Sequence, residues 1–255
     1  MIQKIKRFID KYKMLQKNDR VLIGISGGSD SIFLTEVLLR LKNLYKNEIF
    51  ACHINHQLRK ASGKDAEFVK IFCKKLDIPV EIKKIKLRKF SEEKARNLRY
   101  KIFKNVAKKY KCNKIATGHT LNDNAETVLM WLARGCGARG LQGIPPVRGK
   151  IIRPILCVSK KEIFSYLKKN KIKHCIDITN FSTKFTRNKI RLNIIPQLEK
   201  INPKAVRHIF ELSEKLRGSR VDIKEKKCYN NFLLKEKTVL FDAAKIDIKK
   251  IKIRK

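Results

Sequence analysis

The sequence predicts an α/β fold built on a parallel β-sheet, and three observations support this prediction. Short apolar runs alternate with longer segments of helical spacing along most of the 255 residues. A pair of glycines separates the first apolar run from the helical segment that follows it. Hydrophobic residues make up 43% of the chain, which is enough for a buried core. We therefore expect a sheet with helices on both faces and right-handed crossovers between its strands.

The expected elements follow one another in a regular order. Residues 1–15 place apolar side chains on one helical face with lysines between them, which predicts an amphipathic helix docked on its own domain. Strands are expected at residues 21–25, 49–54, 80–85 and 114–117, and helices at 32–44, 66–76, 92–110, 122–134, 159–169 and 189–200. Residues 134–149 are rich in glycine and contain Pro145-Pro146, so they are expected to form a loop or lid.

The chain divides into two predicted parts, a catalytic domain over residues 1–200 and a short basic helical extension over residues 201–255. No stretch is long and apolar enough to span a bilayer. The seven cysteines are widely spread and form no C-x-x-C pair, so neither a zinc ribbon nor an iron–sulfur site is indicated. Free thiols of this kind predict a reducing, cytoplasmic location. No membrane partner is expected, because the N-terminal helix is predicted to dock on its own domain and no stretch spans a bilayer.

The charge of the chain is its first functional signal. Lysine and arginine number 62 against 23 acidic residues, a formal net charge of +39. Such an excess suits a polyanionic partner, because cations that neutralise phosphates release condensed counterions. An A/T-rich genome would also enrich lysine throughout a protein, and both explanations stay open at this point. The charge predicts RNA or DNA as a partner without indicating a chemistry.

The motif SGGSDS, residues 26–31, follows the first predicted strand and begins a helix. Two adjacent glycines allow a tight turn and a close approach of the backbone to a ligand. The N–H groups of the first helical turn then face an anion, and the three serines add hydroxyl donors. The motif lacks the ending of a P-loop and the G-x-G-x-x-G of a dinucleotide fold. It predicts a different phosphate cradle, although a glycine-rich turn with an ordinary helix cap is the simpler alternative.

A second motif, GHTLNDNAET, covers residues 118–127 and follows the last of these short strands. Its helix places Asp123 and Glu126 on one face, and His119 precedes them at the sheet edge. A histidine beside two carboxylates can orient a nucleophile, bind magnesium or hold an ammonium group. The alternative is a helix whose first turn is acidic because the helix dipole favours negative charge there.

Three further segments carry candidate functional side chains. The first, ARNLRY, places Arg96 and Arg99 on a predicted helix, and the second, HINHQLR, places two histidines at the end of a strand. The third begins with D-I-T-N at residues 177–180 and continues with Arg187 and Arg191, which are four apart on one helical face. That spacing suits a bidentate grip on phosphate.

The SGGSDS motif resembles the pyrophosphate loop of the N-type ATP pyrophosphatases, the PP-loop superfamily, whose domain is adenine-nucleotide alpha-hydrolase-like. All the motifs together, in this order and over residues 21–203, resemble those of the tRNA(Ile)-lysidine synthetases. The first two motifs are shared with the related tRNA 2-thiocytidine synthetases. The ARNLRY segment and the D-x-T-N…R-N-x-I-R…P-x-L pattern point to the lysidine family, and the absence of C-x-x-C disfavours thiolation.

The resemblance implies a ligase that joins L-lysine to C2 of the wobble cytidine of tRNA(Ile) with a CAU anticodon. ATP and Mg²⁺ are the implied cofactors, and ATP is split into AMP and pyrophosphate through an adenylated cytidine. Alternatives that stay open are another PP-loop tRNA-modifying enzyme, such as a thiolase, and a catalytically silent basic RNA-binding protein.

The resemblance also implies roles for individual residues. The pyrophosphate of ATP would be held by the loop residues Ser26, Gly27, Gly28, Ser29, Asp30 and Ser31, with Asp30 also ordering magnesium. Arg99 and His119 would stabilise phosphate charge, and Asp123 with Glu126 would hold the ammonium of lysine. Arg187 and Arg191 would act as a gate or as a phosphate contact.

Two features depart from the family pattern. Only residues 204–255 follow the last motif, where family members carry one or two further tRNA-binding domains. Selection of the tRNA is therefore expected to rest on the catalytic domain, on the extension or on a second copy in a homodimer. In addition, Lys160-Lys161 stands after the RPIL run where the family has an arginine, with no evident consequence.

Overall fold

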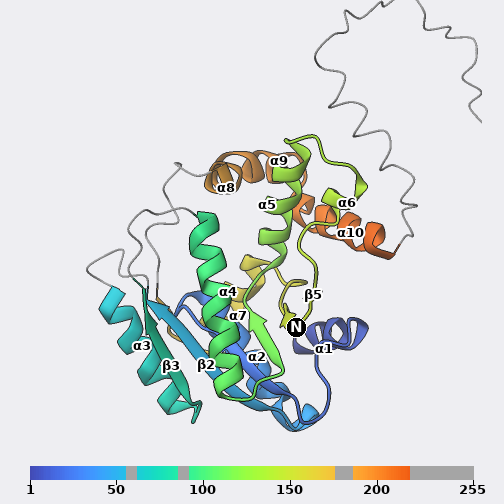
Figure 1. Ribbon diagram of the computed structural model, residues 1–255. Coiled ribbons are helices and arrows are strands. Elements are labelled where there is room, and N and C mark those ends of the chain that lie inside the picture. Colours follow the sequence, from blue (N-terminus) through green and yellow to red (C-terminus); the bar gives the residue numbers. More distant parts are fainter. Residues whose placement is uncertain (56–61, 86–91, 176–185, 219–255) are drawn as a thin grey trace, which may run out of the picture. The chain divides into compact units, whose positions relative to one another are not determined.

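The protein is built around a six-stranded sheet with the strand order β3-β2-β1-β4-β6-β5 (Figure 1). The computed structural model describes residues 1–55, 62–85, 92–175 and 186–218. Its strands are β1 (Arg20–Gly24), β2 (Glu48–Asn55), β3 (Val80–Lys84), β4 (Lys114–Thr117), β5 (Val147–Arg148) and β6 (Ile151–Ile152). The first four, together with β6, are parallel, and β5 pairs with β6 in the antiparallel sense. The predicted parallel α/β sheet is confirmed.

The helices predicted at 32–44, 66–76, 92–110, 122–134 and 159–169 begin and end within four residues of those positions. They are α1 (Ile2–Lys11), α2 (Ser29–Tyr45), α3 (Ser62–Lys75), α4 (Glu92–Lys109), α5 (Leu121–Leu132), α6 (Ala138–Leu141), α7 (Lys160–Lys169), α8 (Thr186–Lys189), α9 (Ile195–Ile201) and α10 (Ala205–Gly218). A π-helical turn, η2 (Ile190–Ile194), joins α8 to α9. Within the described residues, no helix is both long enough and apolar enough to cross a membrane.

Both faces of the sheet are covered, because side chains alternate along each strand. Leu22 of β1 packs in one cluster with Phe103 and Val106 of α4. Its neighbours Val21 and Ile23 point to the other face, into the larger core formed with α1, α2, α3 and α7. Figure 1 shows α4 crossing one face of the sheet. This confirms the expected arrangement of helices on both faces.

The segment expected to be a loop or lid, residues 134–149, contains structure that the sequence did not reveal. It holds the short helix α6, and it ends in the β5–β6 hairpin, which turns at Gly149 with a φ of +57°. Strands of two residues are too short to show a period-2 pattern. The segment is fixed to α10, since Arg217 donates hydrogen bonds to the carbonyls of Gln142 and Ile144.

The extension predicted over residues 201–255 is described only as far as Gly218. Its described part is α10, which packs against α5 and carries the buried residues Val206 and Phe210. Residues 219–255 lie outside the described residues. The predicted division into domains therefore stays a prediction.

The strand order creates a switch point between β1 and β4, where crossovers leave in opposite directions. The two strands are in register, with Gly24 opposite Thr117. Ligands of open parallel sheets bind beyond the carboxyl ends of the strands at such a point. The SGGSDS motif follows β1 there, and the GHTLNDNAET motif follows β4.

We expect the N-terminal helix to stabilise the whole domain. Ile9 of α1 is fully buried in the larger core, so Ile9→Ala should lower the free energy of unfolding by about 2 to 5 kcal/mol. Urea unfolding followed by circular dichroism measures this change. Ile201→Ala removes the same atoms from a side chain that is 84% exposed, so it should have almost no effect. Equal effects of the two variants would show that α1 is not part of the cooperative unit.

Candidate active site

The turn after β1 is held in shape by its own serines. Ser31 is buried, and its Oγ accepts a hydrogen bond from the backbone N–H of Ser26 at 3.1 Å and donates to the carbonyl of Gly28 at 3.0 Å. The Ser26 and Ser31 hydroxyls lie 3.1 Å apart. Gly27 has a φ of +90°, which side-chain-bearing residues rarely adopt. Ser31 therefore shapes the loop together with Ser26, whose Oγ accepts a hydrogen bond from the N–H of Gly28 at 3.3 Å although the residue is exposed.

The first turn of α2 is left without a side-chain cap. Its N-cap residue is Gly28, whereas α5 and α7 each begin with a full capping box, at Thr120 and at Ser159. The first N–H groups of a helix have no partner inside the helix. An uncapped N-terminus beside a glycine turn therefore offers N–H donors and the positive end of the helix dipole to an anion.

The end of β4 packs directly against this turn. Gly118 lies so close to α2 that a Cβ on it would be 3.2 Å from the carbonyl carbon and oxygen of Asp30. A side chain at this position would push the second motif away from the first. The missing side chain of Gly118 therefore allows the two motifs to share one site.

His119 follows this glycine and is held by a neighbour on the same strand end. Its Nδ1 lies 2.9 Å from the hydroxyl oxygen of Thr117. Burial lowers the pKa of His119 to about 3, although the negative charge of Asp123 opposes this shift. The imidazole is therefore neutral at neutral pH, and it can donate one hydrogen bond to a phosphate without adding a positive charge.

Asp123 has a structural role at the start of α5 as well as a place in the site. Its Oδ2 accepts hydrogen bonds from the backbone N–H and the hydroxyl of Thr120, both at 2.8 Å. Burial raises its pKa, but the positive charges of Arg187 and Lys160 outweigh burial and bring the pKa of Asp123 down to about 2. The carboxylate is therefore ionised, with Oδ1 directed to Arg187 at 3.4 Å.

Glu126 lies one turn further along α5 and is fully buried. Its Oε2 accepts a hydrogen bond from Nε of Arg187 at 2.7 Å, and its Oε1 accepts one from Nε of Arg191 at 2.6 Å. Arg191 adds a second bond from Nη2 to Oε2 at 2.9 Å. Charged hydrogen bonds of this length are among the strongest side-chain contacts. The predicted pair of arginines on one helical face is present, and in this structure it grips Glu126.

The helix that carries these arginines is irregular at this point. The sequence predicts one continuous helix over residues 189–200, but the π-helical turn η2 interrupts it and includes Arg191. Such π-turns often mark functional sites. Pro196 follows in the first turn of α9, where its missing N–H costs little.

Lys160 reaches the site from the N-terminus of α7, and sequence reasoning missed its position. Its Nζ lies 3.6 Å from Oδ2 of Asp30. Burial raises the pKa of Asp30, while the charge of Lys160 lowers it. The lysine pair was noted as a departure from the family pattern, but only the folded chain shows that one of the two lysines faces the SGGSDS turn.

A cavity of about 490 Å³ brings most of these groups together, although Lys160 and Glu126 are not among its lining residues. Of the predicted site residues, its lining includes Ser26, Asp30, Ser31, Arg99, His119, Asp123, Arg187 and Arg191. Gly27, Gly28 and Ser29 lie in the loop beneath it, and Glu126 lies behind the two arginines. Arg96, Tyr100 and Thr117 also line the cavity. The predicted residues from both motifs are thus brought together.

Two further predicted segments have different outcomes. His53 is buried, with its Nδ1 3.0 Å from the carbonyl oxygen of Ile25, which fits a structural role. Its companion His56 and the D-I-T-N segment at residues 177–180 lie outside the described residues. No prediction about them is tested.

The predicted magnesium ligand Asp30 fits a nucleotide-bound ion. Mg²⁺ in such sites uses one or two carboxylates together with phosphate oxygens and water. The carboxylate of Asp30 lies beside the loop that would hold the phosphates, with a 3.2 Å hydrogen bond from Ser29. Among the described residues, no cluster of three or more histidine, cysteine or acidic side chains forms a metal site. Asp30 therefore fits as a protein ligand of a magnesium ion held chiefly by phosphates.

We expect His119 to make folding sensitive to mild acid. Between pH 6.5, the ordinary pKa of the imidazole, and a folded value of about 3, the unfolded chain binds a proton that the folded chain does not bind. The free energy of unfolding should therefore fall as the pH falls, by up to about 1.4 kcal/mol per pH unit from this residue. Urea unfolding between pH 4.5 and 7 avoids the lower range in which Asp123 titrates.

The variant His119→Gln should reduce this slope. His208→Gln removes an exposed imidazole on α10 and is the matched control, expected to leave the slope unchanged. An unchanged slope in His119→Gln would contradict the assignment of a neutral buried imidazole.

We also expect Glu126 to be essential for stability. Glu126→Gln leaves two partly buried guanidinium groups facing a neutral amide, so the free energy of unfolding should fall by about 3 to 5 kcal/mol. Glu48→Gln breaks an exposed pair with Arg20 and should cost at most about 1 kcal/mol. Urea unfolding of both variants at neutral pH tests the difference, and a similar small loss in both would contradict it.

Comparison with known proteins agrees with this geometry. The PP-loop domain family matches residues 1–198. The tRNA(Ile)-lysidine synthase of Caldanaerobacter subterraneus subsp. tengcongensis is 45% identical over 212 residues, which cover 79% of this chain and 45% of that protein. The tRNA(Ile)-lysidine synthase of Petrotoga mobilis is 37% identical over 231 residues, which cover 88% of this chain and 74% of that protein.

The fold is also similar to a solved structure. The U34-tRNA thiolase NcsA from Methanococcus maripaludis, solved with its [4Fe-4S] cluster, matches with a TM-score of 0.70 at 21% sequence identity, over 88% of this chain and 81% of that one. The chain spans about half the length of several of the curated relatives that it matches. The PP-loop match over most of the chain and the identity to the Petrotoga mobilis protein place this chain in the PP-loop family, within the tRNA(Ile)-lysidine synthase group.

Proposed function

We propose that the chain ligates L-lysine to C2 of the wobble cytidine of tRNA(Ile) and cleaves ATP to AMP and pyrophosphate. The observation that carries the proposal is the junction, in one cavity, of an uncapped glycine turn with Asp123 and two arginines, which Glu126 holds from behind. The glycine turn suits the phosphates of a nucleotide, and Asp123 with the two arginines suits the charged groups of an amino acid. The similarity to proteins named tRNA(Ile)-lysidine synthase supports this interpretation.

The proposed ATP half of the site is the turn after β1. Its N–H groups and Ser26 would hold the pyrophosphate, and Asp30 would share a magnesium ion with it. Lys160 and the neutral His119 lie near this turn, and we propose that they face the α-phosphate, where charge develops during attack. Fixed donors and cations of this kind stabilise a transition state without having to reorganise.

The proposed lysine half is the cluster on α5 and η2. Asp123 stays ionised, so it can bind the substrate ammonium, and Arg187 and Arg191 can bind the substrate carboxylate. In this structure the arginines neutralise the two acids. When lysine binds, its ammonium would therefore take the place of the Arg187 guanidinium as the positive charge beside Asp123. Glu126 would keep the two arginines in place.

The proposed reaction has two steps. The O2 atom of cytidine attacks the α-phosphorus of ATP, and the bond to the β-phosphate breaks to release pyrophosphate. The side-chain amine of lysine then attacks C2, and the C2–O2 bond breaks so that the oxygen leaves on AMP. The amine has an ordinary pKa of about 10.4, so it must lose a proton before attack. We propose that this proton passes to solvent, because Asp30 is taken up by magnesium and the lowered pKa of Asp123 makes that carboxylate a poor acceptor.

The proposed partners follow from the reaction. The wobble cytidine must leave its stack to reach a cavity of this kind. The tRNA is proposed to be tRNA(Ile) with the CAU anticodon, acting in the cytoplasm. A homodimer stays a proposal that the sequence left open.

The first experiment is pyrophosphate release from ATP with an unmodified tRNA(Ile) transcript, with and without labelled lysine. We expect pyrophosphate release together with lysine incorporation into the tRNA. Cleavage of ATP without lysine incorporation would favour another PP-loop tRNA-modifying enzyme, such as a thiolase. No cleavage would favour a silent RNA-binding protein.

Asp123→Asn tests the lysine half separately. The variant keeps an oxygen that caps α5 but loses the charge, so kcat/KM for lysine should fall about 10- to 100-fold, the equivalent of a charged hydrogen bond. Binding of ATP, measured by titration calorimetry, should stay unchanged.

A matched control is Asp77→Asn, because Asp77 is exposed and has a φ of +52° that asparagine also tolerates. It should leave both quantities unchanged. An unchanged KM for lysine in Asp123→Asn would contradict the proposed role of Asp123.

A further inference from the structure

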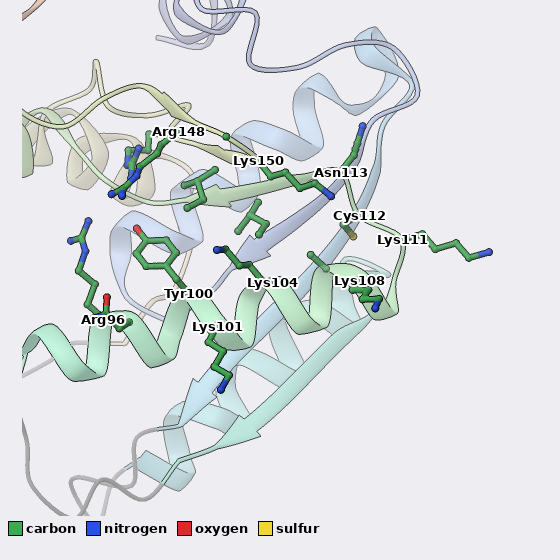
Figure 2. Close-up of a pocket in the computed structure, with 16 residues that line it drawn as sticks. Arg96, Tyr100, Lys101, Lys104, Lys108, Lys111, Cys112, Asn113, Arg148 and Lys150 are labelled. Carbon is green, nitrogen blue, oxygen red and sulfur yellow. The ribbon is translucent and has the colours of Figure 1, made fainter.

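A second and larger hollow lies outside the site, along α4. Its volume is about 1120 Å³, and it lies between α4 and the β5–β6 hairpin (Figure 2). Figure 2 shows Tyr100 and Lys104 on the α4 side, facing Arg148 and Lys150 on the hairpin side. The reaction proposed above makes no use of this groove.

The charge of the groove is unbalanced. Eight of the sixteen residues that line it are lysine or arginine, and none of the lining residues is acidic. Among the described residues, no carboxylate forms an ion pair with Lys104, Lys108 or Lys150. Other lysines of the chain do have such partners, as Lys109 on the other side of α4 has in Glu81 at 2.8 Å. The groove therefore concentrates positive charge that the protein itself does not neutralise.

Arg153 adds an unusual group at the groove. It is 1% exposed, its Nη1 donates to the carbonyl of Pro145 at 2.5 Å, and its Nε has no hydrogen-bond partner among the described residues. Arg153 also hydrogen-bonds the side chain of Tyr100, so only part of its guanidinium lacks a partner. Arg96 and Arg148 lie close enough to Arg153 to repel it, so this end of the groove gathers positive charge that a phosphate would offset.

The groove adjoins the candidate active site. Arg96 and Tyr100 line both cavities. The guanidinium of Arg96 lies 5.5 Å from the centre of the Tyr100 ring, so an aromatic face with a cation beside it marks the passage. Rings of this kind stack with nucleobases, and cations along a groove follow a phosphate backbone.

We propose that this groove binds the sugar-phosphate backbone of the RNA substrate next to the modified nucleotide and directs that nucleotide past Tyr100 into the site. The inference rests on the proposed function, because it takes the substrate to be an RNA. Residues 96–109 of α4 span roughly 20 Å at 1.5 Å per residue, so one strand of several nucleotides fits along the helix. The lysines lie three to four residues apart on this helix, which repeats the positive charge along the strand.

The test is direct binding of an unmodified tRNA(Ile) transcript in the absence of ATP and lysine, over a range of KCl concentrations. The variant is Lys104→Gln, Lys108→Gln and Lys150→Gln together, since glutamine keeps the length of the side chain and its helix propensity. Loss of three phosphate contacts should reduce the slope of log K against log salt by about 2 to 3, and weaken binding at least about tenfold at 0.15 M. The matched control is Lys74→Gln, Lys75→Gln and Lys169→Gln, which removes the same charge from exposed lysines outside the groove.

A second measurement uses the unaltered chain. Acetylation of lysines, followed by mass spectrometry, should show protection of Lys104, Lys108 and Lys150 by the transcript, with Lys74 and Lys75 still modified. Protection by ATP alone would overturn the proposal, because the groove would then extend the nucleotide site. Equal salt slopes in the two triple variants would also overturn it.

These outcomes are independent of the ligase reaction. A chain that incorporates lysine but shows no groove protection overturns only the groove. A chain that binds RNA through the groove but incorporates no lysine overturns only the proposed function.

Discussion

The buried carboxylate of Glu126 is the constraint on which the site depends. A fully buried charge is tolerated only when it is paired and hydrogen-bonded, and both partners here come from α8 and η2. Since α5 begins beside the switch point, these ion pairs fix the position of Arg187 and Arg191 at the edge of the cavity. Glu126 therefore positions the groups that we propose to bind lysine, although it does not line the cavity itself.

The opposite face of α5 is held as firmly. Asn124 is fully buried, accepts hydrogen bonds from the backbone N–H of Ile144 at 2.8 Å and from Arg217, and donates to Ser213 at 3.1 Å. These contacts join α5 to α10 and to the segment before the hairpin. Neighbouring residues of one helix thus have separate tasks, because a step of one residue turns the side chain by about 100°. The packing behind α5 therefore holds Asp123 and Glu126 rigidly in position.

The features predicted from the sequence are those set by local patterns. Apolar runs and helical spacing located β1 to β4 and their helices, and the SGGSDS motif located the turn after β1. The contacts that the sequence could not reveal join distant residues, such as Lys160 with Asp30 and Arg187 with Glu126. The π-helical turn at Arg191 was hidden for a related reason, since one extra residue per turn leaves the apolar pattern nearly unchanged. Ser31 is a further example. Its residue type predicts a hydroxyl donor for a ligand, but not that this hydroxyl is already used in hydrogen bonds within the loop.

Positive side chains have different surroundings in the two cavities, and this difference helps to interpret the formal net charge of +39. A compositional bias towards lysine would scatter cations over the surface, and many would find acidic neighbours, as Lys11 does in Glu214. In the candidate active site, Asp123 and Glu126 neutralise Arg187 and Arg191. These arginines therefore hold side chains in position and do not by themselves attract a polyanion. Along α4 and the hairpin, the cations cluster without acids and reach the site through Arg96 and Tyr100. Lysines and arginines without acidic neighbours favour binding of a polyanion, because its phosphates supply the opposite charge. The clustering of these cations, and not the net charge of the chain, therefore distinguishes a binding surface from a compositional bias towards lysine.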